Sequence, residues 1–273
     1  MTSSAPRLFC FGLGYSAQVL ARALIAKGWS VAGTCRDKTE LDDLAAEAFL
    51  FDQAEDISPW LAGATHVLSS VPPGQDGDPV LNRYGDQLAA IPWAGYLSTT
   101  GVYGDRDGGW VREGDALNPT SDRATRRAAA EAQWRALMPV HIFRLAGIYG
   151  PGRNVLDGKA RPIEKPGHMF SRIHVHDIAN VVQASMARPH PGAIYNVCDD
   201  EAAAPAEVIA YGYRLRGLAP PPTEDFAQVE KDMSPMKRSF WADNKRVDNS
   251  KIKSELGVKL IYPTYREGLA ACM

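Results

Sequence analysis

The stretch LFCFGLGYSAQVLARALIAKG, residues 8–28, decides the fold of this chain. It begins with an apolar run typical of a buried strand, and its residues 16–27 favour a helix. Between them lie Gly12, Gly14 and Ala17 in a Gly-x-Gly-x-x-Ala pattern. In this context the first glycine permits a tight turn, the second lets the backbone approach a pyrophosphate, and the small third residue lets the helix pack closely. The stretch therefore predicts a dinucleotide-binding turn. A turn that merely needs glycine is the simpler alternative.

The phosphates of such a dinucleotide are expected at the start of the helix. The first turn of a helix has backbone N–H groups without helical partners, and the helix dipole is positive at this end. Tyr15 and Ser16 occupy this turn, so we expect both to contact the cofactor together with the three small residues of the pattern.

Short apolar runs and longer amphipathic segments alternate along the first half of the chain. The predicted strands are residues 8–11, 30–34, 48–51, 66–69, 95–98 and 140–145, and the clearest helices are residues 16–27 and 122–137. Strands that alternate with helices form parallel sheets, because each crossover packs a helix on the sheet. The pattern predicts an α/β protein with a doubly wound parallel-sheet Rossmann fold and a small C-terminal substrate lobe.

We expect two domains. Residues 1–198 form the NAD(P)-binding Rossmann domain, with a substrate-side loop inserted at about residues 147–171, where Gly, Pro and basic residues are frequent. Residues 199–273 form the small C-terminal lobe. Five apolar residues at helical spacing predict a core-facing helix before it: Val175, Ile178, Val181, Val182 and Met186.

The end of the second strand bears on the choice of cofactor. An NAD-binding fold commonly places a carboxylate here for the ribose hydroxyls, but this chain has Arg36 followed by Asp37. A guanidinium binds a phosphate through a two-pronged fork, so Arg36 favours NADP(H), with NAD(H) as the alternative. Asp37 as a ribose ligand and Arg36 as a solvated surface charge are the competing interpretations.

Three further residues are expected near the adenosine half of the cofactor. Asp52 closes the third predicted strand, where such folds often contact the adenine, although a capping role suits it nearly as well. Ser70 and Val71 follow the fourth strand and are expected to pass beneath the adenosine.

Composition and charge exclude several classes of function. The chain has 273 residues and a formal net charge of -2, so its bulk charge does not favour nucleic acid. No run approaches the roughly 18 consecutive apolar residues of a membrane-spanning helix, and the first predicted strand starts too early for a secretory leader. The cysteines and histidines show no metal-binding spacing. We expect a cytoplasmic protein without a metal, a membrane or a nucleic-acid partner.

The sequences STTGVYGD, residues 98–105, and FRLAGIYGPGR, residues 143–153, follow the fifth and sixth predicted strands. Together with RIHVHDIANVV, residues 172–182, and KRVDNSKIKSELG, residues 245–257, they resemble the extended short-chain dehydrogenase/reductases. These include nucleotide-sugar epimerases and dehydratases. The resemblance covers nearly the whole chain and implies a nicotinamide cofactor and a small-molecule substrate.

The resemblance also implies a catalytic arrangement that this chain retains only in part. Thr99 matches the Ser or Thr that polarises the reacting oxygen of the substrate. The family's Tyr-x-x-x-Lys pair, counted back from Glu131, falls on Arg123 and Arg127. A guanidinium stays protonated at neutral pH and cannot replace the acid–base phenol. Arg127 is expected to bind the cofactor ribose and Arg123 an anionic group of the substrate, or both are surface charges.

Other residues are weaker candidates. Tyr103 and Tyr149 lie in loops at the carboxyl edge of the sheet, where a phenol could act as acid or base, although a packing role is simpler. Arg153 and Arg172 match segments that contact substrate in the resembling family. A basic pocket for an anionic substrate is one interpretation of these arginines, with Arg144, Lys237 and Arg238 as further members. Solvated charges or internal ion pairs are the other interpretation.

These observations leave two classes of function. The first is an atypical NADP(H)-binding member of the resembling family, acting as an oxidoreductase or an epimerase/dehydratase on an anionic small molecule. The second is a catalytically silent sensor of NADP(H) or a scaffold, which the loss of the Tyr-x-x-x-Lys pair motivates. Members of the resembling family form dimers through two helices, the one before the fifth predicted strand and residues 122–137, so the resemblance also implies a homodimer.

Overall fold

The computed structural model describes residues 5–53 and 55–273, apart from a few side chains: those of Glu40, Pro235, Met236, Lys237 and Ser239. The chain divides into two compact units. Unit 1 comprises Met1–Ser98, Arg126–Arg144 and Ile178–Tyr195, and unit 2 comprises Thr99–Thr125, Leu145–Asp177 and Asn196–Met273. The expected boundary after residue 198 lies close to the start of the last segment of unit 2. That unit also takes in two earlier segments, one of which contains the predicted loop at about residues 147–171.

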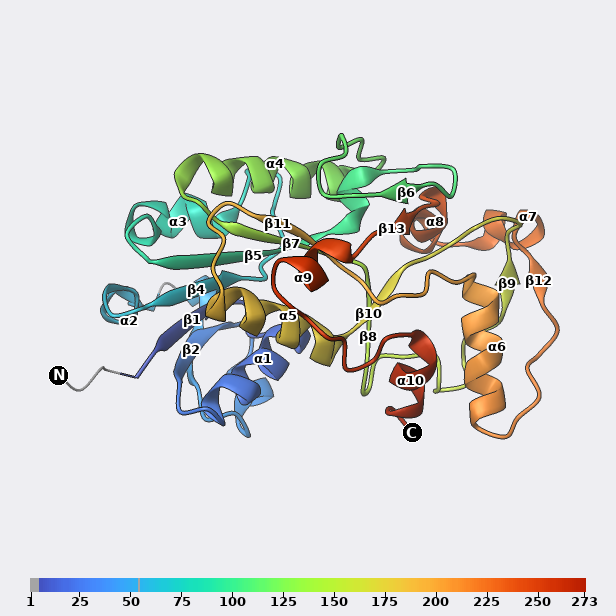
Figure 1. The fold of residues 1–273 in the computed structure, drawn as a ribbon, viewed down its shortest axis with the longest axis horizontal. Coiled ribbons are helices and arrows are strands. Elements are labelled where there is room, and N and C mark those ends of the chain that lie inside the picture. Colours follow the sequence, from blue (N-terminus) through green and yellow to red (C-terminus); the bar gives the residue numbers. More distant parts are fainter. Residues whose placement is uncertain (1–4, 54) are drawn as a thin grey trace. The chain divides into compact units, whose positions relative to one another are not determined.

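Unit 1 is built on a seven-stranded sheet in the order β11-β7-β5-β4-β1-β2-β3 (Figure 1). Its strands are β1 (Arg7–Phe11), β2 (Ser30–Cys35), β3 (Glu47–Leu50), β4 (His66–Ser69), β5 (Trp93–Thr99), β7 (His141–Leu145) and β11 (Ile194–Val197). Strand β1 pairs in parallel with β2 on one side and β4 on the other. The strand order reverses at β1, so the carboxyl ends of β1 and β4 flank the position where open α/β sheets bind ligands. The predicted doubly wound parallel sheet is confirmed.

Helices flank this sheet, with α1 and α5 on one face and α3 and α4 on the other (Figure 1). The helices whose residues lie wholly or partly in unit 1 are α1 (Tyr15–Ile25), α2 (Ser58–Ala62), α3 (Pro79–Leu88), α4 (Asp122–Leu137) and α5 (Val175–Ala187). The predicted apolar stripe of α5 is confirmed, because each of its five members is at most 9% exposed. Helix α3 was not individually predicted. Its N-cap is Asp78, whose carboxylate accepts from the N–H groups of Val80 and Leu81.

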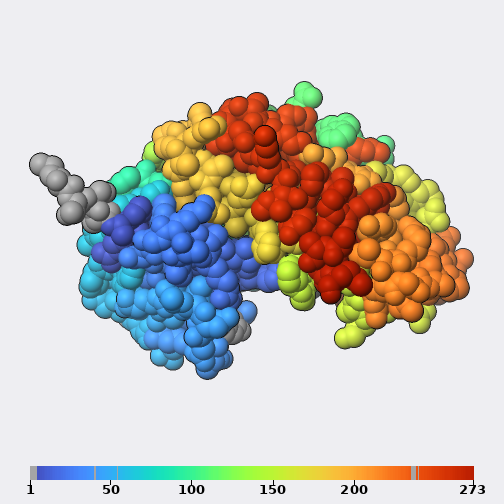
Figure 2. Space-filling view, turned by 60° about the horizontal axis from the view of Figure 1, so that its bottom comes forward, coloured from blue at the N-terminus to red at the C-terminus, as the bar shows by residue number. Residues whose placement is uncertain are grey.

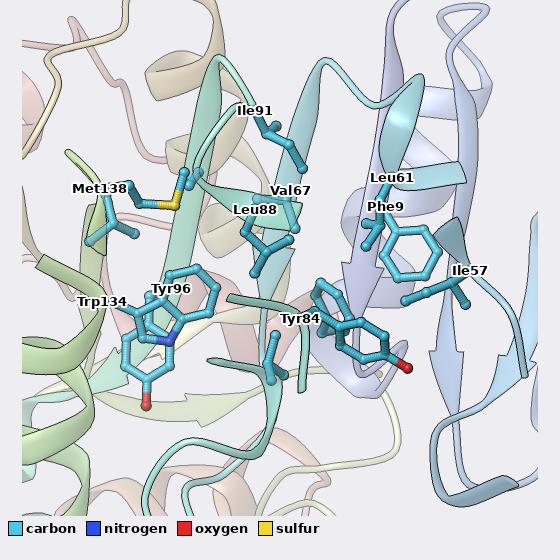
Figure 3. Close-up of a cluster of buried hydrophobic side chains, with 14 of the residues drawn as sticks. Phe9, Ile57, Leu61, Val67, Tyr84, Leu88, Ile91, Tyr96, Trp134 and Met138 are labelled. Atoms are coloured by element: carbon cyan, nitrogen blue, oxygen red, sulfur yellow. The ribbon is translucent and has the colours of Figure 1, made fainter. Parts of the chain in front are cut away.

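The core of unit 1 forms where the sheet meets α3 and α4. Alternate strand residues such as Phe9, Val67 and Tyr96 point to this face, and they pack against helix residues such as Tyr84 and Trp134 (Figure 3). The period of two along each strand explains why neighbouring strand residues are buried on opposite faces. This packing holds β4 and most of β5 in the core of unit 1.

Unit 2 contains three short pairs of parallel strands that join segments distant in sequence. They are β8 (Gly147–Tyr149) with β10 (Arg172–His174), β9 (Ile163–Glu164) with β12 (Glu224–Asp225), and β6 (Trp110–Val111) with β13 (Arg246–Val247). Its helices are α6 (Pro205–Leu215), α7 (Phe226–Val229), α8 (Pro235–Ala242), α9 (Ser250–Ser254) and α10 (Tyr265–Ala270). The C-terminal residues, red in Figure 2, lie against the orange segment that includes α6, and Val208 and Leu269 belong to one buried cluster there.

The described residues contain neither a membrane-spanning helix nor a metal-binding cluster. In that part of the chain no helix combines the length and apolar character needed to cross a bilayer. Over the same residues, no three or more His, Cys, Asp or Glu side chains are grouped so as to hold a metal ion.

Candidate functional site

The glycine turn of unit 1 has the geometry that its sequence predicts. Gly12 has φ +84°, a backbone conformation that side chains disfavour. A Cβ at this position would lie 2.7 Å from Ser70 Oγ. The Gly12 N–H donates to Thr34 Oγ1 at 2.9 Å, and Ser70 Oγ donates to the Gly12 carbonyl oxygen at 2.6 Å. Hydrogen bonds to β2 and from the loop after β4 therefore hold both backbone polar groups of Gly12 in place.

Helix α1 begins directly after this turn with an open N-terminus. Gly14 is the N-cap, and no side chain caps the helix there. A Cβ at Gly14 would meet no heavy atom within 4 Å, so space lies beside this residue. Tyr15 and Ser16 form the first turn and are half-buried, whereas Ala17 is 1% exposed and packs the helix on the sheet. Uncapped N–H groups beside open space are suited to a phosphate.

The end of β2 presents one cation without an acidic partner. Arg36 is exposed, and no ion pair or hydrogen bond of its side chain occurs among the described residues. Asp37 turns its carboxylate back to accept from the Thr39 N–H and hydroxyl groups at 3.0 and 2.8 Å, which also lowers its pKa. Lys38 is paired with Glu55 at 2.9 Å. Both bonds from Thr39 are accepted by Oδ1 of Asp37, which holds this carboxylate against its own loop, and Arg36 is available.

The other residues expected near the adenosine lie on neighbouring loops of unit 1. Asp52 is exposed in a short 3-10 helix, Phe51–Gln53, that follows β3. Ser70 and Val71 are half-buried just after β4. Ser70 holds the glycine turn, and the Val71 carbonyl oxygen accepts from Arg127. A cofactor role for these residues stays a prediction.

Arg127 is buried rather than on the surface of α4. It is 8% exposed, and its Nη1 donates to the Tyr96 hydroxyl at 3.0 Å, to the Leu97 carbonyl oxygen at 3.1 Å and to the Val71 carbonyl oxygen at 3.4 Å. The guanidinium carbon also lies 5.4 Å from the centre of the Tyr96 ring. Arg127 thus joins the loop after β4 to the end of β5.

A buried ion pair lies one turn further along α4. Glu131 accepts from Arg144 Nη2 at 2.7 Å and from the Ser98 hydroxyl at 2.5 Å. Both charged side chains are 4% exposed. Arg144 is therefore an internal ion-pair partner, as one of the two sequence interpretations proposed.

In unit 2, Thr99 and Tyr103 begin and end a single turn, and their environments differ. Thr99 is half-buried, and its hydroxyl oxygen accepts from the Gly101 N–H at 3.1 Å, which leaves the hydroxyl proton to be donated. Tyr103 is fully buried, and its hydroxyl donates to Asn196 Oδ1 at 2.7 Å. Burial and this bond favour a packing role for Tyr103 over an acid–base role.

Tyr149 is also enclosed within unit 2. It is 7% exposed, its hydroxyl donates weakly to the Thr264 carbonyl oxygen at 3.4 Å, and its ring packs edge-on against His174. Burial, together with the nearby Asp199, raises the pKa of Tyr149 above its usual value. A catalytic phenol needs a pKa near the working pH, so this environment also favours packing.

The three predicted substrate arginines have different surroundings. Arg123, in the first turn of α4, is exposed. Arg153 is exposed in a turn closed by backbone hydrogen bonds with Gly150. Arg172 donates to the carbonyl oxygens of Phe170 and Ala203, and burial lowers its pKa to about 10. Their binding of substrate stays a prediction.

Two candidates for the basic pocket remain. Arg238 donates to the carbonyl oxygens of Glu230 and Lys231, and the Lys237 side chain lies outside the described residues. Sequence reasoning missed two participants in unit 1. Thr34 is a polar residue inside an apolar strand, which is a usable signal. Tyr96 reads as an ordinary core residue, and nothing in the sequence marks it as the partner of an arginine.

Comparison with known proteins agrees with this fold. Two solved structures share the fold at low sequence identity. One is MoeE5 in complex with UDP-glucose and NAD, which is 20% identical, with a TM-score of 0.77 and an alignment that covers 98% of this chain and 97% of the other. The other is human epimerase family protein SDR39U1 with NADPH, which is 15% identical, with a TM-score of 0.76 and an alignment that covers 97% of this chain and 98% of the other. The fold is that of the extended short-chain dehydrogenase/reductases and their epimerase/dehydratase-like relatives.

Closer relatives define the family. The chain is 30% identical to Protein YeeZ of Escherichia coli strain K12 over 92% of its own length and 94% of that protein, and it belongs to the same family. It is 52% identical to a functionally unknown conserved protein from Silicibacter pomeroyi, with a TM-score of 0.93 over 98% of both chains. No protein-family model matches the chain.

Proposed function

We propose that this protein binds NADP(H) at the glycine turn of unit 1. Two features of unit 1 together support this proposal. The N-terminus of α1 is uncapped and lies beside open space at Gly14, and Arg36 is a cation that is available to a ligand. The first suits the pyrophosphate, and the second suits the 2′-phosphate that distinguishes NADP(H) from NAD(H). NAD-binding folds usually hold a carboxylate for the ribose at the end of this strand; Arg36 stands there in this chain, and Asp37, the next residue, turns its Oδ1 back to Thr39.

The bound nicotinamide would supply hydride transfer. We propose that the protein is an oxidoreductase or an epimerase/dehydratase-type enzyme acting on an anionic small molecule. Thr99 would orient the substrate by donating its hydroxyl proton to the reacting oxygen. The hydroxyl oxygen of Thr99 only accepts in its bond with the Gly101 N–H, so the proton is not used there. Arg123, Arg153 and Arg172 are proposed contacts for the anionic group.

One observation favours a second candidate, a catalytically silent NADP(H) sensor or scaffold. The family's acid–base phenol is absent, and both loop tyrosines, Tyr103 and Tyr149, are buried against neighbours. A site that keeps the cofactor turn while both of these loop phenols are buried is what a sensor needs. A homodimer is compatible with either candidate, and light scattering tests it.

The cofactor proposal is tested by the pair Arg36→Ala and Lys38→Ala, with binding of NADPH and NADH followed by fluorescence. Charge-assisted bonds contribute about 1.5–3 kcal/mol, so Arg36→Ala should weaken NADPH binding roughly 10- to 100-fold and leave NADH binding unchanged. Lys38 is already paired with Glu55, so Lys38→Ala is the matched control and should change neither. Equal weakening by both variants would show general charge attraction instead.

Turnover separates the two candidate functions. Purified protein with NADPH or NADP⁺ is assayed against a panel of carbonyl acids and nucleotide sugars. Absorbance of the reduced nicotinamide reports net oxidation or reduction, and chromatography of the products reports epimerase/dehydratase turnover, which regenerates the cofactor. Turnover that Thr99→Val abolishes, while NADPH binding is retained, supports the enzyme. Tight NADPH binding without turnover on the whole panel supports the silent protein.

A further inference from the structure

Arg127 is a buried cation without an acidic partner among the described residues. None of the ion pairs found there, at 4.0 Å or less, includes it. Two buried carboxylates belong to the same part of unit 1, but both are engaged. Glu131 is paired with Arg144, and Asp78 accepts from Trp134 Nε1 and the first N–H groups of α3.

The groups that hold Arg127 are all neutral. They are two backbone carbonyl oxygens and the hydroxyl of Tyr96, whose ring packs beside Trp134 (Figure 3). Neutral acceptors satisfy hydrogen bonds but supply no opposite charge, and a buried charge without one is costly. The arrangement is explained if a bound ligand supplies the negative charge.

The guanidinium also has donors left for such a ligand. Among the described residues only Nη1 of Arg127 donates, so the N–H groups of Nε and Nη2 keep their capacity. Those two nitrogens form one edge of the guanidinium, which matches the two oxygens of a carboxylate or a phosphate. The bonds through Nη1 fix the plane of the group in advance, which lowers the entropic cost of binding.

We propose that Arg127 binds an oxyanion of the substrate, a carboxylate or a phosphate group, at the carboxyl edge of the unit 1 sheet. Its backbone acceptors place it there, because Val71 follows β4 and Leu97 lies near the end of β5. The inference rests on the proposed function in one respect. The cofactor's own anionic groups have complements at the α1 N-terminus and at Arg36, so Arg127 is left for a third anion.

The test is thermal unfolding with inorganic phosphate and with malonate, each with and without saturating NADPH, at ionic strength matched with potassium chloride. The variants are Arg127→Gln, which keeps donors but removes the charge, and Arg127→Lys, which keeps the charge without the fork. Arg135→Gln, at an exposed position on the same helix, is the matched control.

We expect at least one anion, at about ten times its dissociation constant, to raise the Tm of the wild-type protein by roughly 2–6 °C. Arg127→Gln should abolish this shift, Arg127→Lys should retain part of it, and Arg135→Gln should match the wild type. The anion that raises the Tm shows whether the substrate carries a carboxylate or a phosphate group. Equal shifts in Arg127→Gln and wild type, or no shift with either anion, would overturn the inference.

Measurement of NADPH binding separates this inference from the proposed function. If Arg127→Gln binds NADPH within about threefold of the wild type, the anion is not the cofactor's. If that variant loses NADPH binding and the anion acts only without NADPH, Arg127 serves the cofactor and the inference fails. If the wild type binds the anion but not NADPH, the proposed function fails while the anion site stands.

Discussion

Replacing Gly12 by alanine perturbs the turn in a way that the structure quantifies. Gly12 has φ +84°, and the left-handed region costs a non-glycine residue about 1–2 kcal/mol. The new Cβ would lie 2.7 Å from Ser70 Oγ, so Ser70 must move and give up its bond to the Gly12 carbonyl oxygen. That bond is worth about 0.5–1.5 kcal/mol. The total, about 1.5–3.5 kcal/mol, lowers Tm by roughly 3–14 °C in a chain of this size.

Gly14→Ala is the matched comparison, because the same methyl group is added two residues later. Gly14 has φ -86°, which alanine adopts readily, and its Cβ would meet nothing within 4 Å. We therefore expect a stability change below about 1 kcal/mol. The methyl group would, however, occupy space that we assign to the pyrophosphate, so NADPH affinity should fall at least ~10-fold.

Differential scanning fluorimetry measures the first effect and fluorescence titration with NADPH the second. The reasoning predicts that Gly12→Ala loses both stability and affinity, whereas Gly14→Ala loses affinity alone. A Gly14→Ala protein that binds NADPH like the wild type would refute the placement of the pyrophosphate. A Gly12→Ala protein with an unchanged Tm would refute the steric argument.

Three further predictions concern the buried polar groups. Glu131→Gln leaves a buried arginine unpaired and should cost about 3–5 kcal/mol in denaturant unfolding, whereas Glu255→Gln, in an exposed pair, should cost under about 0.5 kcal/mol. Burial raises the pKa of Asp199 from 3.8 to about 8, so the folded state keeps a proton that the unfolded chain releases. The wild type should therefore lose stability from pH 4 to 8, and the Tm advantage of Asp199→Asn should grow over that window; a constant difference would contradict this. Tyr103→Phe strands the buried Asn196 oxygen and should cost about 1–3 kcal/mol without altering NADPH affinity, both measurable on one sample.

Much of unit 1 was predictable because its signals are local. Apolar runs set the strands, and β4 and α4 have the predicted bounds of 66–69 and 122–137. The glycine turn was predictable for the same reason, since a φ above zero and a close approach leave glycines in the sequence.

The remaining features depend on contacts between residues distant in sequence. The paired strands of unit 2 are two or three residues long, too short for a periodic pattern, and each joins segments far apart in the chain. The helix pattern showed that Arg123 and Arg127 are four residues apart, but it could not show that the first is exposed and the second buried. The burial of Tyr149 likewise depends on Gly268 of α10, which leaves room for its ring.

The central claim is that the glycine turn binds NADP(H) in preference to NAD(H). The most direct measurement is an equilibrium titration of the purified protein with NADPH and, separately, with NADH, followed by the fluorescence of the reduced nicotinamide. The account predicts saturable binding of NADPH at least ~10-fold tighter than that of NADH, because only NADPH engages Arg36. Equal affinities would contradict the assignment to Arg36, and no binding of either nucleotide would contradict the cofactor site itself.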